Sequence, residues 1–515
     1  MTDPAILQGP ALSQSQPQAL VLGLGLSGLA LARWCARQGW AVTVADTREA
    51  PPGLDALRRE LPAARFVAGP LDAALARGKA CVWRSPGLSP AQFGPIFDTA
   101  RADGARVGAE LDLFSAELSR LAAERDYRPR VLAVTGTNGK TTVTVLTGRL
   151  LERAGLDVAV AGNIGPTLLD TLAARLDAGR LPAVWVLELS SFQLHGVEGF
   201  GPTAATVLNL SEDHLDWHGD MAAYAAAKAR VFGPGTRAVL NRDDAAVLAL
   251  LSASPAAGRG RVPPGRPVVT FGADAPRRPG DWGLETSHGM TWLVRAQGEV
   301  ALRPRRGSDT AIEVPPTLQR LMPADALRIA GRHNALNALA ALALAEAAGA
   351  PLAPMLHALR EYRGEPHRCE PVAVVSEVEY IDDSKGTNVG ATVAAMSGLG
   401  AQRRLVLILG GDGKGQDFAP LAGPLARHAR AAVLIGRDAA RLRAALDASG
   451  VPLVDAADMG AAVRAAAAAA RPGDAVLLSP ACASLDMFDN YRHRGQCFRE
   501  AVAALARDVG QEPSA

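Results

Sequence analysis

The chain has 515 residues, too many for one ordinary hydrophobic core, and a prior of roughly 100–200 residues per domain predicts about three domains. Its 54 basic side chains are nearly balanced by 52 acidic ones, which argues against nucleic-acid binding as the main activity. The five cysteines are widely spread without a C-x-x-C pair, and no run of about 18 apolar residues occurs. We therefore expect a soluble cytoplasmic protein with no zinc cluster and no membrane insertion.

The N-terminal part of the chain predicts a leader followed by a parallel sheet. Residues 1–18 are polar and rich in Pro and Gln, and we expect them to be disordered. The next segments alternate between strand and helix, as is typical of a parallel α/β sheet. We assign 19–118 to this first domain because the stretch at 123–130 is polar and charged, like a linker. The expected elements are a strand at 19–23, a helix at 27–38 and a strand at 41–45.

A second domain is expected at 119–366. Residues 253–325 within it are rich in Pro, Gly and Arg and predict an insertion of loops and short surface strands. An Ala/Leu-rich helix at 334–348 closes the domain. Its expected strands lie at 131–134, 184–189 and 205–210.

A third domain is expected at 367–515, with strands at 372–375, 405–409, 432–435 and 475–478. The predicted fold class is therefore α/β, with three consecutive domains. The first is Rossmann-like, the second is a central P-loop ATPase-type domain with a parallel sheet, and the third is again Rossmann-like.

A glycine-rich turn, GLGLSG at 23–28, joins the first predicted strand to the first helix. The following strand ends in Asp46, at the place where a Rossmann unit grips a ribose. This pattern predicts a diphosphate at the helix N-terminus, but it does not distinguish NAD, FAD and a UDP-sugar. A further turn after a short strand is equally consistent with a ligand contact and with a plain turn; it consists of Ser85, Pro86 and Gly87.

A second glycine turn follows the strand at 131–134 and opens a helix, a context that holds nucleotide phosphates. Backbone N–H groups close around phosphate oxygens, a lysine adds positive charge near the β and γ phosphates, and a threonine hydroxyl ligates Mg²⁺. The loop is a shortened G-x-x-G-K-T form of the general G-x-x-x-x-G-K-[ST] motif. Its residues are Gly136, Thr137, Asn138, Gly139, Lys140, Thr141 and Thr142.

Metal-ligand candidates follow neighbouring strands of the second domain. Glu188 ends the strand at 184–189, and with Thr141 it offers the hard oxygens that Mg²⁺ prefers; a solvated carboxylate is the alternative. His214 follows the next strand and is a candidate ligand, although single histidines are more often structural. Lys228 lies one helical turn from Tyr224, and periodicity alone indicates only a solvated charge.

The third domain adds three turns rich in glycine or hydroxyl groups that predict an anion site: DDSKGTN at 382–388, GGDGKG at 410–415 and SPACASLD at 479–486.

Together these segments resemble the Mur ligase family. The resemblance covers nearly the whole chain apart from the leader and the insertion, and the motifs appear in family order. They are TGTNGKTT, GNIG at 162–165, ELSSFQL at 188–194, LNLSEDHLD at 208–216, GRHN at 331–334, DDSKGTN, GGDGKGQDF and SPACASLDMF, of which the last is the most specific.

The resemblance implies an ATP-dependent ligase of peptidoglycan precursor synthesis. It implies that D-glutamate is joined to UDP-N-acetylmuramoyl-L-alanine through an acyl phosphate, with ATP and two Mg²⁺ ions. It also implies a carbamylated lysine, because a carbamate on Lys228 would help His214 to hold the second Mg²⁺, whereas an ammonium cannot ligate a metal. We expect a monomer.

The resemblance also assigns residues to the reaction. Catalytic roles are implied for Lys140, Glu188, His214, Lys228 and Lys385. The ATP site would comprise the loop Gly136 to Thr142 with Asn334, Asn337, Arg368 and Asp383. The UDP-substrate would lie against Gly25, Leu26, Ser27, Asp46, Thr47, Arg48, Ser85, Pro86, Gly87, Asn163 and His214. D-Glutamate would contact Thr387, Lys414, Ser484, Leu485 and Tyr491, where the last departs from the phenylalanine common in the family. The metal ligands would be Thr141, Glu188, His214 and carbamylated Lys228.

Four alternatives remain for comparison. A ligase for meso-diaminopimelate would carry a D-N-P-R motif in its last domain, and this sequence has none. A folylpolyglutamate synthase would not need the GLGLSG domain. A nucleotide-sensing module would not need the full set of lysines and acids, and an NAD-linked oxidoreductase leaves the second and third domains unexplained.

Overall fold

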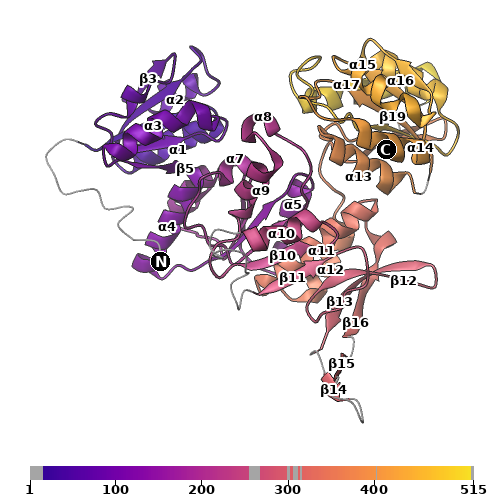
Figure 1. Ribbon diagram of the computed structural model, residues 1–515, viewed down its shortest axis with the longest axis horizontal. Helices are drawn as coiled ribbons and strands as arrows, with labels where there is room; N and C mark the ends of the chain where they lie inside the picture. The colour runs from indigo at the N-terminus through magenta and orange to yellow at the C-terminus, as the bar shows by residue number, and fades with distance from the viewer. Residues whose placement is uncertain are drawn as a thin grey trace.

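The computed structural model describes residues 16–253, 267–298, 302–304, 311–313, 316–401 and 403–511. Most of the leader expected at 1–18 and parts of the insertion expected at 253–325 lie outside these residues. Figure 1 shows three α/β lobes, with the N-terminal and C-terminal lobes on either side of the middle one. The predicted class of three consecutive α/β domains is confirmed. None of the helices in the described ranges has the length and apolar character needed to cross a bilayer.

The N-terminal lobe is a five-stranded parallel sheet in the order β3-β2-β1-β4-β5. The switch in strand order beside β1 places the loops after β1, β2 and β4 at one edge, where ligands bind in such sheets. Its elements are β1 Gln18–Leu22, α1 Leu26–Arg37, β2 Ala41–Asp46, α2 Leu54–Glu60, β3 Arg65–Ala68, a 3₁₀ turn Ala73–Ala76, β4 Cys81–Arg84, α3 Pro90–Ala102, β5 Arg106–Ala109 and α4 Glu110–Arg125.

The middle lobe is a nine-stranded sheet in the order β16-β13-β12-β11-β10-β9-β6-β8-β7. Strands β6 to β11 are parallel, and β12, β13 and β16 pair antiparallel. Its first half contains β6 Arg130–Thr135, α5 Lys140–Arg153, β7 Val158–Gly162, α6 Leu168–Asp177, β8 Val184–Glu188, α7 Ser191–Leu194, β9 Ala204–Val207, α8 Leu215–His218, α9 Met221–Ala229, β10 Arg237–Asn241 and α10 Ala245–Ala253. Its second half contains β11 Val268–Phe271, β12 Trp282–Ser287, β13 Met290–Gln297, the hairpin β14 Leu302–Pro304 and β15 Ala311–Glu313, β16 Thr317–Pro323, a 3₁₀ turn Ala324–Ala326, α11 Arg332–Ala347 and α12 Leu352–Glu361.

The expectation of loops and short surface strands at 253–325 is wrong for most of the described part of that segment. Strands β11, β12, β13 and β16 extend the central sheet, and their side chains Phe271, Trp282, Leu293 and Met322 are buried in the core beneath α11. The Pro and Gly residues in the described part lie largely in the turns between these strands. Composition averaged over the segment therefore concealed the short apolar runs within it.

The C-terminal lobe is a six-stranded sheet in the order β17-β18-β22-β19-β20-β21, parallel except for the edge strand β17. The predicted strands at 372–375, 405–409, 432–435 and 475–478 are confirmed. The elements are β17 Glu370–Val375, β18 Val378–Asp382, α13 Val389–Leu399, β19 Leu405–Gly410, a 3₁₀ turn Ala419–Leu421, α14 Ala422–His428, β20 Ala429–Ile435, α15 Ala439–Leu446, a 3₁₀ turn Asp447–Ser449, β21 Leu453–Asp455, α16 Met459–Ala469, β22 Ala475–Leu478 and α17 Tyr491–Asp508.

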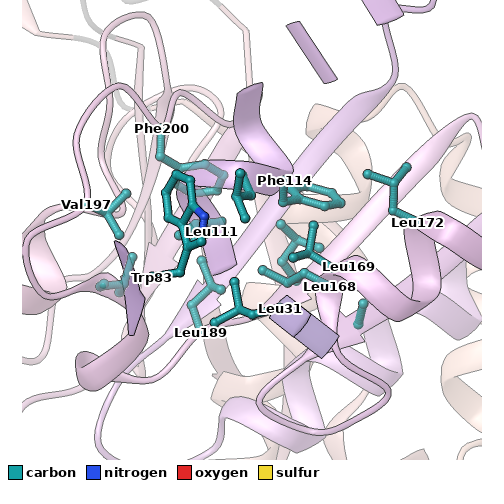
Figure 2. Packing of buried hydrophobic residues seen from close by; sticks show 14 of the residues in the cluster. Leu31, Trp83, Leu111, Phe114, Leu168, Leu169, Leu172, Leu189, Val197 and Phe200 are labelled. Atoms are coloured by element: carbon teal, nitrogen blue, oxygen red, sulfur yellow. The ribbon is translucent and has the colours of Figure 1, made fainter. Parts of the chain in front are cut away.

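One hydrophobic cluster joins the N-terminal and middle lobes. Figure 2 shows Leu31 of α1 and Phe114 of α4 packed near Leu168, Leu169 and Leu172 of α6. Helix α4 contributes to this shared cluster, and the domain boundary expected at residue 118 falls inside this helix. The buried clusters of the C-terminal lobe, by contrast, contain only residues of that lobe.

Candidate active site

The phosphate loop connects β6 to α5, as predicted, and its glycines adopt conformations that other residues avoid. Gly136 has φ +146° and Gly139 has φ +83°. A Cβ at position 139 would lie 2.7 Å from Oδ1 of Asn337 on α11, so the loop and this helix are in close contact. Asn334 lies one turn earlier on α11 and accepts a hydrogen bond from Asn337 Nδ2 at 3.1 Å. The structure thus brings both predicted asparagines of α11 to the loop.

Two lysine side chains converge on one carbonyl of this loop. Lys140 Nζ donates to the oxygens of Gly136 and Thr137 at 3.0 and 2.9 Å. Lys228 Nζ donates to the same Gly136 oxygen at 2.8 Å and lies 4.5 Å from the ring centroid of Tyr224. Lys228 is only 1% exposed. The interpretation of Lys228 from periodicity alone, as a solvated charge, is therefore wrong.

The surroundings of the two lysines lower the pKa of both side chains. Burial lowers the pKa of Lys140, while the charges of Glu188 and Asp213 oppose this shift. Burial lowers the pKa of Lys228 well below its ordinary value, and the positive charge of Lys140 lowers it further. Lys228 therefore has the larger tendency to be an uncharged amine.

Glu188 ends β8 beside the phosphate loop, and it too is 1% exposed. Its Oε1 accepts a hydrogen bond from Asn163 Nδ2 at 2.7 Å. Its Oε2 is buried and has no hydrogen-bond partner among the described residues. Buried carboxylate oxygens are normally paired, so this oxygen is suited to a cation.

His214 occupies a left-handed conformation, φ 56°, immediately before α8. Its Nε2 lies 3.5 Å from Asp213 Oδ2, and its ring centroid lies 4.7 Å from that of Phe192 on α7. Burial lowers the pKa of His214, the Asp213 charge opposes this, and the charges of the nearby lysines lower it further. A neutral imidazole is the form that ligates metals.

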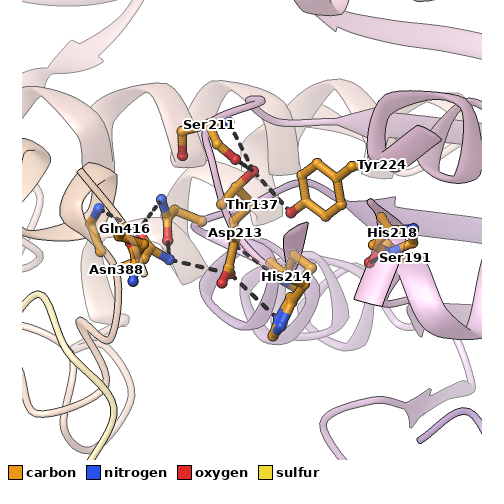
Figure 3. A network of polar contacts seen from close by, with 12 residues as sticks. Thr137, Ser191, Ser211, Asp213, His214, His218, Tyr224, Asn388 and Gln416 are labelled. Atoms are coloured by element: carbon orange, nitrogen blue, oxygen red, sulfur yellow. Dashed lines mark hydrogen bonds and ion pairs between the residues drawn. The ribbon is translucent and has the colours of Figure 1, made fainter. Parts of the chain in front are cut away.

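A polar network joins the phosphate loop to the C-terminal lobe (Figure 3). Thr137 Oγ1 lies 3.1 Å from the Tyr224 hydroxyl and accepts from the Ser211 N–H at 3.0 Å. Asn138 and Asn388 exchange side-chain hydrogen bonds at 3.2 and 3.0 Å. Asn388 Nδ2 also donates to Asp213 Oδ2 at 3.5 Å. Sequence reasoning singled out neither Asp213 nor Asn388, although the motifs SEDH and DDSKGTN contain them.

Further predicted site residues contact one another, and one of these contacts joins the middle lobe to the C-terminal lobe. Arg368 Nη2 donates to Thr141 Oγ1 at 2.5 Å. Asp383 accepts from Ser479 Oγ at 2.6 Å, and burial raises the pKa of Asp383 to about 7. Lys385 Nζ lies 4.2 Å from the ring centroid of Tyr491, and burial lowers the pKa of Lys385 to about 8.

The glycine and hydroxyl turns of the C-terminal lobe lie next to one another. Asp412 and Ala483 form an isolated antiparallel bridge, which joins the turn at 410–415 to the turn at 479–486. Lys414 is exposed with φ 50°, Leu485 is 73% exposed, and Ser484 is buried. Thr387 belongs to the turn after β18, whose Gly386 carbonyl accepts from the Ala481 N–H at 2.9 Å. The three predicted anion-binding turns therefore form one surface.

The predicted nucleotide edge of the N-terminal lobe has its own arrangement. Asp46 accepts from the Leu24 N–H at 2.7 Å and from Arg48 Nε and Nη2 at 2.8 Å each. Burial would raise the pKa of Asp46, but the hydrogen bonds from Arg48 and Leu24 outweigh it and lower the pKa to about 2. Both carboxylate oxygens of Asp46 are therefore engaged by donors of the same lobe. Leu26 is 82% exposed at the start of α1.

A histidine and two carboxylates outside this site have ligand atoms within 4.8 Å of one another: His367, Glu370 and Asp382. His367 Nδ1 lies 2.8 Å from Asp382 Oδ2, and the guanidinium of Arg499 contacts both carboxylates. This group is an ion-pair cluster that ties α17 to the first two strands of the C-terminal lobe.

Three family models match the chain. The MurD-like N-terminal domain of the Mur ligases matches 17–108, the Mur ligase middle domain matches 134–345, and the glutamate ligase domain of the Mur ligases matches 367–482. A UDP-N-acetylmuramoylalanine–D-glutamate ligase from Albidiferax ferrireducens is 62% identical over 494 residues, 95% of this chain and 97% of the relative. One of the same name from Ralstonia nicotianae is 57% identical over 504 residues, 96% of this chain and 98% of the relative.

Solved structures share the fold at much lower identity. The UDP-N-acetylmuramate–alanine ligase MurC of Thermotoga maritima has a TM-score of 0.54 at 20% identity, covering 95% of this chain and 100% of that one. The MurF ligase of Thermotoga maritima, solved with ADP, has a TM-score of 0.54 at 17% identity, covering 85% and 98%. With three matching domain models and near-full-length relatives above half identity, the chain belongs to the Mur ligase family, in its UDP-N-acetylmuramoylalanine–D-glutamate ligase branch.

Proposed function

We propose that the chain joins D-glutamate to UDP-N-acetylmuramoyl-L-alanine in an ATP-dependent amide-bond ligation. The names of the relatives at 62% and 57% identity support these substrates. The observation that carries the proposal is the convergence of Lys140, Lys228 and Glu188 on the phosphate loop, with Arg368 reaching Thr141 from the C-terminal lobe. From the same relatives we also propose a cytoplasmic monomer.

The proposed ATP site is the phosphate loop with Asn334 and Asn337 of α11 and with Arg368 and Asp383 of the C-terminal lobe. The backbone N–H groups of Gly139 and the start of α5 would face the phosphates, because those of Thr137 and Asn138 donate to Asn209. The guanidinium fork of Arg368 matches phosphate oxygens. Lys140 adds positive charge where the γ-phosphate moves to the acceptor.

The residues around the loop fit magnesium. The unpaired Oε2 of Glu188 and the hydroxyl of Thr141 are hard oxygen ligands. His214, with its lowered pKa, and a carbamate on Lys228 complete the proposed set. When bound, Mg²⁺ neutralises phosphate charge. The low pKa of Lys228 supports the carbamate, because only the neutral amine adds to CO₂.

The proposed substrate carboxylate and amine come from opposite lobes. The uridine nucleotide would lie against the N-terminal lobe at Gly25 to Ser27, Asp46 to Arg48 and Ser85 to Gly87, with Asn163 and His214 nearer the muramoyl group. D-Glutamate would lie on the joined turns of the C-terminal lobe, at Thr387, Lys414, Ser484, Leu485 and Tyr491, near the catalytic Lys385.

The proposed chemistry has two steps. A carboxylate oxygen of the UDP-substrate bonds to the γ-phosphorus of ATP, and the bond to ADP breaks, which gives an acyl phosphate. The amine of D-glutamate then bonds to the acyl carbon, inorganic phosphate leaves, and the amine loses a proton to water or base. One ATP is consumed for each amide bond.

A phosphate-release assay tests this assignment. Phosphate should appear only when ATP, UDP-N-acetylmuramoyl-L-alanine and D-glutamate are all present, because the phosphate group leaves the acyl phosphate only when the amine attacks. Three reactions, each lacking one substrate, provide the controls. Turnover with L-glutamate or L-lysine equal to that with D-glutamate would contradict the proposal.

A further inference from the structure

Arg84 is a buried cation at the junction of the N-terminal and middle lobes, and the proposed chemistry gives it no role. It is the last residue of β4 and is 2% exposed. Burial lowers the pKa of Arg84 to about 10, so the side chain remains charged at neutral pH. A buried charge destabilises the fold unless hydrogen bonds compensate for its lost hydration. The contacts that Arg84 makes therefore bear on its function.

The contacts of Arg84 cross from one lobe to the other. Its Nη2 donates to the carbonyl oxygens of His195 and Phe192 at 2.6 and 3.1 Å. These carbonyls belong to the end of α7 in the middle lobe, where helix carbonyls lack intrahelical partners. The guanidinium also lies 4.7 Å from the ring centroid of Phe93 on α3 of the N-terminal lobe.

The segment that Arg84 grips is rigidly attached to Glu188. Only Leu189 separates Glu188 from Ser190, which caps α7. Ser190 Oγ accepts from the Gln193 N–H at 3.2 Å, and Gln193 Oε1 accepts from the Ser190 N–H at 3.0 Å. This reciprocal capping box fixes the start of α7 to the end of β8. On the other side, Arg84 is followed directly by the turn Ser85 to Gly87.

The same helix end also packs against the segment that carries His214. The ring centroid of His195 lies 5.0 Å from that of Trp217 on α8, and Phe192 lies 4.8 Å from Trp217. Trp217 in turn packs against the N-terminal cluster that contains Phe93. The end of β4, the end of α7 and helix α8 therefore share one set of contacts, and Arg84 belongs to it.

We propose that Arg84 is a positioning residue for the UDP-substrate. Arg84 connects the turn at 85–87 with the end of α7. It thereby sets the distance between the bound nucleotide and the segments that carry Glu188 and His214. The acceptor carboxylate is thereby delivered to the γ-phosphate. This inference rests on the proposed function.

Steady-state kinetics of Arg84→Met and Arg84→Lys test it. For Arg84→Met the KM for the UDP-substrate should rise about tenfold or more, since hydrogen bonds from a charged group are lost. The KM values for ATP and D-glutamate should change less than about twofold, because their sites lie on other segments. Arg84→Lys keeps the charge and should show a smaller rise. The matched control is Arg33→Met, which removes the 3.0 Å contact to Asp170 across the same lobe junction, away from the turn; its KM values should not change.

The outcomes separate the two claims. Absence of ligation by the wild-type protein overturns the proposed function. With an active wild type, unchanged KM values in both Arg84 variants overturn the positioning role. An equal change in all three KM values and in kcat, together with a lowered melting temperature, would also overturn the positioning role. Such a result would indicate that Arg84 has a structural role only. If Arg84→Met does not fold, Arg84→Lys decides the question by the same selective rise.

Discussion

Lys228 shows how burial changes what a side chain can do. Its ammonium nitrogen shares the Gly136 carbonyl with Lys140, and it lies over the Tyr224 ring. Desolvation and the neighbouring charge both disfavour its protonated form. A lysine that only stabilised the fold would gain nothing from this pairing, whereas the proposed carbamate would supply an anionic oxygen ligand near Glu188.

We predict that Lys228→Ala loses activity by at least about a hundredfold and that acetate or formate partly restores it, because a small carboxylate can occupy the space of the carbamate. Phosphate release with and without added carboxylate measures this. The control is Lys79→Ala, because Lys79 is a half-exposed lysine of the N-terminal lobe. This variant should keep the wild-type activity, and added carboxylate should not change it. Failure of every carboxylate to rescue a folded, magnesium-binding variant would rule out the carbamate.

Asp46 leads to a second prediction, which concerns how the free energy of unfolding depends on pH. Its pKa is about 2 in the fold against an ordinary value of 3.8, because the Arg48 and Leu24 hydrogen bonds outweigh burial. The native state therefore binds this proton less readily than the unfolded chain. The stabilisation is complete above roughly pH 4 and is lost as the pH falls toward 2.

Denaturant unfolding of wild type and Asp46→Asn measures this effect. The difference in unfolding free energy should be larger near pH 6 than near pH 3, since only the ionised carboxylate gains from Arg48. Asp98→Asn, whose exposed carboxylate forms only a 3.4 Å surface pair with Arg101, is the control. An equal difference at both pH values would contradict the assigned pKa.

At the scale of elements, the sequence predicted the parallel strands and their glycine turns well. Continuous apolar runs such as 131–134 and 405–409 have few alternatives to a buried strand, and a glycine pair before Lys140 requires the loop that the structure contains. The antiparallel strands β12 and β13 were obscured because their short apolar runs lie in a segment rich in turn residues.

The roles of the site residues stay predictions, and the structure adds the contacts between these residues. Motifs single out Lys140 and Glu188, and the family resemblance adds Arg368, yet no local pattern says that Arg368 meets Thr141 or that Asn388 meets Asn138. These contacts depend on how two lobes are placed, which is set by packing far from the motifs. Arg84 was overlooked for the same reason, since an arginine at a strand end is ordinary until its partners are known.

The helices at the lobe junction lead to a stability prediction. Leu169 of α6 is buried in the cluster shared with α1 and α4, so Leu169→Ala should lower the unfolding free energy by about 2–5 kcal/mol. All seven tryptophans lie between residues 34 and 292, so their fluorescence follows the N-terminal and middle lobes alone.

Leu425→Ala in the C-terminal core is the matched control, because Leu425 is equally buried in a cluster of that lobe only. It should shift part of the circular dichroism transition and leave the fluorescence midpoint unchanged, whereas Leu169→Ala should move the fluorescence midpoint. A fluorescence shift of the same size from Leu425→Ala would show that all three lobes unfold as one unit.

The whole molecule combines one apolar junction with one polar junction. The N-terminal and middle lobes share a hydrophobic core, whereas the C-terminal lobe meets the middle lobe through polar contacts such as Arg368–Thr141 and Asn388–Asn138. Polar interfaces within a chain permit relative motion more readily than large apolar ones. The proposed carboxylate and phosphate sites therefore lie on a firmly joined pair of lobes, and the amine site lies on the more adjustable third lobe.

Mass spectrometry of the ligation product tests the central claim most directly. The protein is incubated with ATP, UDP-N-acetylmuramoyl-L-alanine and an equimolar mixture of deuterated D-glutamate, unlabelled L-glutamate and L-lysine, and released phosphate is counted in the same reaction. The expected result is a UDP-muramoyl product that carries deuterated glutamate, with one phosphate released for each product. A product that carries lysine or unlabelled glutamate, or phosphate release without any ligated product, would contradict it.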